Sequence, residues 1–181
     1  MIGSGLNLKN INQDLPYILS ASTLVLQSTR DGSGTKTLVI EEDRTFTLSK
    51  KPMHLIRAAC HHYGTSLKVA TNHAKHLLYN RHKVPILIAF NHGFPLIMIP
   101  TMSATSEQNI WIALHAIKNY KGDKFGHTTI QLINNQFIRI NASEATIQRQ
   151  LSLAYILQLD YQNRFSHLNG PWFSPRRPHM K

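Results

Sequence analysis

Alternating apolar and polar residues between turn-forming residues characterise the first quarter of the chain. Residues 15–27 alternate loosely and are rich in Leu, Val and Ile, and an Asp31-Gly32-Ser33-Gly34 turn precedes a second such segment at 35–40. After the acidic turn at 41–43, residues 45–48 alternate again. This pattern predicts a β-hairpin or a meander of three strands.

Two consecutive segments then have helical periodicity. Residues 49–64 fit a helix because Pro52 is tolerated in a first turn and Gly64 suits the position after a last turn. Residues 65–79 fit a second helix, with Thr65 or Ser66 as its cap. The apolar stripes of the two helices are Met53, Ile56, Cys60 and Tyr63, and Leu67, Ala70, Ala74 and Leu77. The opposite faces carry His54, Arg57 and His61, and Lys68, Asn72, Lys75 and Tyr79. The pair is therefore predicted to pack on a core while offering a basic surface to a polyanion.

Short apolar segments between turns predict strands in the middle of the chain. Residues 84–90 and 94–100 flank the turn at 91–93 and indicate a hairpin of buried strands. The alternation at 110–117 predicts another strand, and the segments 128–133 and 136–140 flank Asn134-Asn135, a tight turn. We therefore expect an antiparallel sheet.

A last helix is predicted from Ser143, its cap, to about Tyr161. Such a helix is either deeply buried or part of an interface between subunits, and burial is the commoner explanation of a wide apolar face. Its apolar residues are Ile147, Leu151, Leu153, Ala154, Tyr155, Ile156 and Leu157. Residues 169–181 are rich in Pro and Arg, which is typical of a mobile basic tail.

The length of 181 residues is that of one domain. We expect residues 1–168 to form a single α+β domain with an antiparallel β-sheet, a central pair of basic helices and a long C-terminal helix. Residues 1–7 do not resemble a signal peptide, and the apolar runs at 84–90 and 94–102 are too short for a membrane helix. The lone Cys60 excludes an internal disulfide and a cysteine-based zinc cluster, and we expect it to be buried. These features predict a soluble cytoplasmic protein with no membrane partner.

The net charge of +11 points to a partner, because such an excess of cations attracts nucleic acid phosphates or an anionic membrane surface. Residues 44–106 contain no Asp or Glu, but they hold eight of the Lys and Arg residues and seven of the eleven histidines. The alternative is that these cations scatter over the fold as ordinary solvated residues. Gathered on the helix pair, they would bind DNA by releasing condensed counterions, with an affinity that falls steeply with salt. The candidate DNA-binding residues are Lys50, Lys51, Arg57, Lys68, Lys75, Arg81 and Lys83. Of these, Arg57 and Arg81 are candidates for insertion into a narrow A/T-rich minor groove, with a plain phosphate contact as the alternative.

Enzyme chemistry has little support in the sequence. The nine carboxylates lie partly in predicted turns, and the chain has no Gly-x-Ser-x-Gly elbow, Walker-type phosphate loop or dinucleotide fingerprint. His73 and His76 stand one turn apart, near His61-His62 of the neighbouring helix, but a histidine zinc site would want a third ligand and a supporting carboxylate that this acid-free segment does not locally supply. We therefore expect no catalytic residues, no metal and no cofactor.

Several short motifs follow one another between residues 44 and 165. The more specific are Cys60-His61-His62-Tyr63-Gly64, His82-Lys83-Val84-Pro85-Ile86, and Pro100-Thr101-Met102-Ser103 with the following Trp111. In their order and spacing they resemble the competence transcription factor family, ComK. The resemblance implies a bacterial activator of DNA-uptake genes that binds paired A/T-rich boxes of double-stranded DNA in the minor groove, as a dimer or tetramer. It also implies RNA polymerase and a protease adaptor as protein partners.

The sequence departs from the family pattern in three places. Family members carry a Gly-Arg or Gly-Lys pair shortly after a Gly-x-Ser box, which here is Gly64-Thr65-Ser66. This chain has Val69-Ala70 in place of that pair, with Lys68 as the nearest replacement. The stretch at 106–109 is less cationic, and the C-terminal region, which the resemblance connects with the protease adaptor, is short. Two main hypotheses follow: a DNA-binding activator, or a degenerate relative that modulates an active one through the helix at 143–161. A small metal-dependent enzyme using His73 and His76 is a third.

Overall fold

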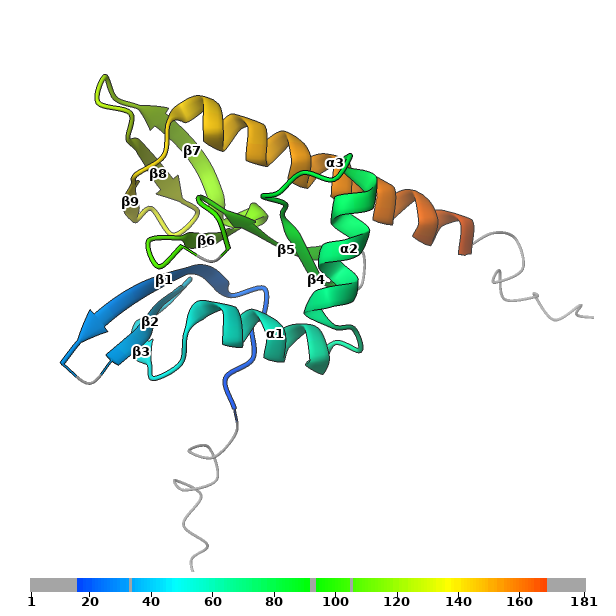
Figure 1. Ribbon diagram of the computed structural model, residues 1–181, viewed down its shortest axis with the longest axis horizontal. Coiled ribbons are helices and arrows are strands. Elements are labelled where there is room, and N and C mark those ends of the chain that lie inside the picture. The colour runs from blue at the N-terminus through cyan, green and yellow to red at the C-terminus, as the bar shows by residue number, and fades with distance from the viewer. Residues whose placement is uncertain (1–15, 33, 92–93, 105, 169–181) are drawn as a thin grey trace, which may run out of the picture.

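The strands form two antiparallel sheets in the computed structural model, which describes residues 16–32, 34–91, 94–104 and 106–168 (Figure 1). The larger sheet has the order β3-β2-β1-β6-β5-β4, with bounds β1 Thr23–Asp31, β2 Gly34–Glu41, β3 Thr45–Leu48, β4 Ile86–Asn91, β5 Phe94–Pro100 and β6 Ile110–Ala113. The smaller sheet has the order β7-β8-β9, with bounds β7 Ile117–Gly122, β8 Thr128–Leu132 and β9 Phe137–Ile140. The predicted α+β class is confirmed, with the strands divided between two sheets. The tail predicted at 169–181 lies outside the described residues.

Three helices complete the described fold: α1 Pro52–His62, α2 Leu67–Leu77 and α3 Glu144–Leu168. Helix α1 begins at Pro52, three residues after the predicted start at residue 49, although Pro52 does lie in its first turn as expected. The predicted cap of α2 is confirmed, since the Ser66 hydroxyl accepts a hydrogen bond from the Val69 N–H at 3.2 Å. The Ser143 hydroxyl similarly accepts a bond from the Thr146 N–H. No helix in the described part of the chain is long and apolar enough to cross a bilayer.

One predicted strand is divided by a change of sheet. The expected strand at 110–117 ends at Ala113, and the 3₁₀ turn η2, Leu114–Ala116, carries the chain from the larger sheet into β7 of the smaller one. The pattern of residues predicts no strand at β7, because all of its residues are exposed or half-buried and it has no clear apolar period.

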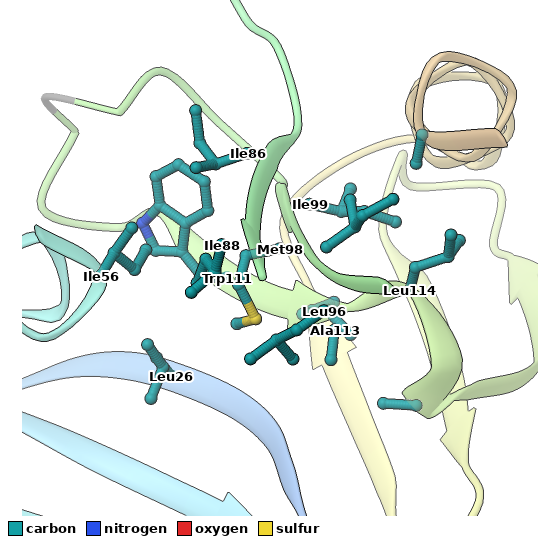
Figure 2. Close-up of a cluster of buried hydrophobic side chains, with 14 of the residues drawn as sticks. Leu26, Ile56, Ile86, Ile88, Leu96, Met98, Ile99, Trp111, Ala113 and Leu114 are labelled. Carbon is teal, nitrogen blue, oxygen red and sulfur yellow. The ribbon is translucent and has the colours of Figure 1, made fainter. Parts of the chain in front are cut away.

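One continuous core joins the three helices to both sheets, and part of it lies where α1 meets the larger sheet (Figure 2). Trp111 is 2% exposed and sits on β6, paired with Leu26 of β1. Its indole lies near Ile56 of α1 and near Ile86 and Ile88 (Figure 2). Because side chains of a strand alternate between faces, the continuous burial of β6 means that both faces of the sheet are covered here. The predicted burial of Cys60 is confirmed.

The wide apolar surface of α3 is divided between core and solvent. The helix packs on β4, β5 and β7, and its buried apolar residues are Ile147, Leu151, Leu153, Ala154 and Leu157. Tyr155 and Ile156 were predicted to be buried with them, but they are 54% and 46% exposed. Beside them Leu159 is 56% exposed, so an apolar strip remains on the outer face of α3. The helix also runs past Tyr161 to Leu168, where Phe165 packs against Phe90 with ring centroids 5.2 Å apart.

Candidate nucleic-acid interface

Helix α1 and the two residues before it carry the first three of the candidate DNA-binding residues. Lys50 and Lys51 are exposed where β3 leads into the helix, and Lys51 is the residue that precedes its first turn. Arg57 is exposed on the face turned away from the core, and it lines one shallow pocket together with His54 and His61. The predicted polar face of this helix is therefore present.

Helix α2 and the turn after it carry the next three. Lys68 is exposed in the first turn, Lys75 is half-buried in the last turn, and Arg81 is exposed just beyond the helix. The opposite face packs on β4 through Ala70 and Ala74, which are 5% and 0% exposed. The predicted division of α2 into an apolar face and a cationic face is confirmed.

The two helices contact each other and form an L in Figure 1, with α1 along the lower side of the molecule and α2 rising from its end. Each has 11 residues, which corresponds to an arm about 16 Å long at 1.5 Å per residue. We call this the basic helix pair, and its cations are Lys50, Lys51, Arg57, Lys68, Lys75 and Arg81. They extend along both arms and do not form one compact patch.

Lys83 has a different environment from these six cations. Its ammonium donates a hydrogen bond to the carbonyl oxygen of Thr101 at 2.9 Å, and its own carbonyl accepts one from the Gln150 side chain at 3.4 Å. Burial, and to a lesser degree the positive charge of Arg149, lowers the pKa of Lys83. Lys83 thus ties the start of the β4 segment to β5 and α3.

Within the described residues, none of the seven candidate cations forms an ion pair with a carboxylate. The ion pairs that lysine or arginine forms with carboxylates in these residues involve other arginines, and one of these carboxylates, Asp160, also contacts His73 of α2. The pairs are Arg30–Glu107, Arg44–Glu41, Arg139–Asp123 and Arg164–Asp160. The charge of the helix pair is therefore not neutralised by the protein itself.

His73, one of the histidines that suggested a metal site, contacts side chains of α3. His73 Nε2 lies 3.2 Å from a carboxylate oxygen of Asp160, and its ring meets the edge of Tyr161, so it joins α2 to α3. The sequence could not show this contact because 87 residues separate the two partners. No group of three His, Cys, Asp or Glu side chains in the described ranges is placed to hold a metal ion.

Val69 and Ala70, which stand where family members carry a Gly-Arg or Gly-Lys pair, have different surroundings. Val69 is 60% exposed beside Lys68, whereas Ala70 is buried against the core. A cation at position 69 would join the exposed surface, and one at position 70 would not.

Taken together, the fold and this surface define a small basic α+β protein that presents unpaired cations on two adjoining helices. Such a surface suits a polyanion with regularly spaced charges. A phosphate backbone has that property.

The comparisons with known proteins agree with this class. The family model described as "ComK protein" matches residues 15–166, which is most of the chain, and the chain therefore belongs to the ComK family. A similar protein is the competence transcription factor of Bacillus subtilis (strain 168), which is 24% identical over 129 residues. That alignment covers 71% of this chain and 66% of the relative, slightly less than two thirds of the relative's length. No solved structure matches the chain.

Proposed function

We propose that this chain is a transcription regulator that binds A/T-rich boxes in double-stranded DNA and activates genes of competence and DNA uptake. The observation that carries the proposal is the basic helix pair, whose six cations lie along α1, α2 and the residues that flank them and have no carboxylate partner among the described residues. The name of the relative, a competence transcription factor, supports the same function and is not that of an enzyme. A regulator of this kind would work in the cytoplasm, where bacterial DNA lies.

The helix pair would supply affinity through phosphate contacts. Lys51 and Lys68 lie at the N-terminal turns of α1 and α2, where the positive end of each helix dipole favours a bound phosphate. Lys83 would support the site by fixing the chain after Arg81. Arg57 and Arg81 remain the candidates for entering a narrow minor groove, where the negative potential is enhanced.

The proposal is tested by reversing charge at the helix pair. The double variant Arg57→Glu/Lys75→Glu should weaken binding to an A/T-box duplex by more than tenfold at moderate salt while circular dichroism remains unchanged. The matched control is Lys121→Glu/Lys124→Glu, which makes the same change in net charge on exposed residues at the β7–β8 end of the molecule (Figure 1). Equal losses in both variants would show that net charge alone, and not this surface, attracts DNA.

The outer strip of α3 supports self-association as part of the same proposal. Leu159 lies four residues after Tyr155 and three after Ile156, so the three side chains share one side of the helix, and all three are about half exposed. Exposed apolar residues gathered on one face mark protein interaction sites. We propose that this strip pairs with the same strip of a second copy, so that two DNA boxes are held at a fixed spacing.

The strip also favours the second candidate function, a relative that does not bind DNA and modulates an active family member by forming a mixed assembly. Sedimentation of the wild type and of Ile156→Glu tests the self-association. Loss of the dimer with retained DNA binding to a single box supports the first function. Tight association with an active relative, combined with no DNA binding by the chain alone, would favour the second function.

A further inference from the structure

A four-residue turn after α2 is exposed to solvent between two buried residues. Leu78 before it and Val84 after it are buried, at 2% and 5% exposure, and Lys83 is hydrogen-bonded to Thr101. All four side chains between these anchors are exposed: Tyr79, Asn80, Arg81 and His82. The turn therefore presents an aromatic ring, an amide, a guanidinium and an imidazole, and no acid.

Tyr79 is the most unusual of these residues. It is 91% exposed and has a φ of +57°, in the left-handed region that glycine normally occupies. Asn80, with the same φ, follows it, although asparagine tolerates this conformation better than tyrosine does.

The end of α1 shows what this position usually requires. There the residue after the C-cap is Gly64, with a φ of +80°, and the next N–H donates to the carbonyl of Cys60 at 2.9 Å. At the end of α2 the equivalent bond runs from the Asn80 N–H to the carbonyl of Lys75 at 2.7 Å. The two helices thus end in the same hydrogen-bonded motif, with glycine in one and tyrosine in the other.

Packing does not explain the tyrosine, because almost none of its side chain is covered. A strained backbone that holds an exposed side chain without a packing role is characteristic of a functional residue. We infer that Tyr79 contacts the floor of the DNA minor groove and donates its hydroxyl hydrogen to adenine N3 or thymine O2. This inference rests on the proposed function and names the residue that reads the A/T-rich boxes.

The chemistry of the groove gives the expected selectivity. The minor groove of an A·T pair displays only acceptors, which suit a hydroxyl donor, whereas a G·C pair adds the guanine 2-amino group, itself a donor. Lys75, one helical turn before Tyr79, would hold a flanking phosphate, and Arg81, two residues after Tyr79, would enter the same groove.

The test compares the wild type with Tyr79→Gly and Tyr79→Phe on three duplexes: an A/T box, a G/C counterpart, and the counterpart with inosine for guanine, which removes the 2-amino group. The wild type should bind the A/T and inosine duplexes alike and the G/C duplex more weakly. Tyr79→Phe should lower the A/T preference about fivefold, as expected for one lost hydrogen bond, and Tyr79→Gly should lower it at least as much. The control is Phe125→Ala, an exposed aromatic of the β7–β8 turn, which should leave the preference unchanged.

Thermal unfolding separates this role from a structural one. Tyr79→Gly relieves the left-handed strain, so its melting midpoint should equal or exceed that of the wild type while its A/T preference falls. A lowered midpoint, or a preference that survives in Tyr79→Gly, would overturn the role of Tyr79 while leaving the proposed function in place. Failure of the wild type to bind any of the duplexes would overturn both.

Discussion

Separate replacements of Lys75 and Lys83 distinguish a cation that meets DNA from one that supports the fold. Six cations of the helix pair are without a carboxylate partner in the described structure. If each neutralises one phosphate, the plot of log affinity against log salt has a slope of about −5.4, at about 0.9 per contact. Raising salt from about 50 to about 200 mM then lowers the affinity roughly 10³-fold. Lys75→Gln removes one contact and should reduce the slope to about −4.5.

Lys83→Met should lower the stability of the fold and leave the salt dependence of DNA binding unchanged. Its ammonium is already bonded to the Thr101 carbonyl at 2.9 Å, so its loss should leave the slope near that of the wild type. Removing this bond from a half-buried site costs about 1 kcal/mol, which lowers the melting midpoint by about 2–4 °C for a chain of this size. Methionine retains most of the apolar stem of lysine, so packing is largely preserved.

Fluorescence anisotropy on one A/T-box duplex at four salt concentrations measures the slopes, and thermal melts monitored by circular dichroism measure the stability. The reasoning would be refuted if Lys75→Gln kept the wild-type slope, or if Lys83→Met reduced the slope as much as Lys75→Gln and left the melting midpoint unchanged. The first result would remove α2 from the interface, and the second would place the Lys83 ammonium on a phosphate.

Three further predictions concern separate parts of the molecule. Val69→Lys adds a cation to the exposed first turn of α2, so anisotropy titrations should give a salt slope that is steeper by about 0.9. Ala70→Lys should destabilise the protein, because Ala70 is buried, and thermal melts will show a lowered midpoint. Burial lowers the pKa of His115, against weaker opposing effects of the Ala21 carbonyl and Glu42, so the folded state resists protonation of this ring. The stability that depends on neutral His115 should therefore be complete above about pH 6.5 and decline as pH falls below it, and urea midpoints at pH 7 and 5 should differ less in His115→Gln. Burial raises the pKa of Cys60 to about 11, so a thiol reagent should label it only as the protein unfolds, and rapid labelling of the native protein would contradict its placement.

The parts of the fold that sequence predicted well are those with a local physical signal. Pro52, Ser66 and Gly64 set helix boundaries through backbone chemistry that acts within a few residues, and the structure confirms each of them. The hairpin of β4 and β5 was similarly marked by two apolar segments around a short turn. Strand β7, in contrast, has no clear alternation of apolar and polar residues, and its position depends on pairing with β8.

Sequence also could not predict those features of the candidate site that depend on the tertiary fold. Sequence could identify a cationic helix pair, but it could not separate Lys83 from the other cations, because the bond to Thr101 depends on how β5 lies beside the turn. It placed Tyr79 on the cationic face of α2, whereas the helix ends two residues earlier and Tyr79 adopts the left-handed conformation. The Tyr79-Asn80 pair carried a usable signal, since asparagine is enriched in left-handed turns that follow helices.

The first turns of the helices give an independent reason to regard the helix pair as a binding surface. A helix is stabilised by about 0.3–1 kcal/mol when an acidic residue lies in its first turn, because the carboxylate complements the helix dipole. Helix α3 follows this rule with Glu144, but α1 and α2 have no acidic residue there and instead place Lys51 and Lys68 at these turns. Both helices therefore forgo a stabilising interaction and leave the positive ends of their dipoles open. Local departures from the most stable choice are expected where function competes with folding, and a phosphate bound at these turns would restore the missing negative charge.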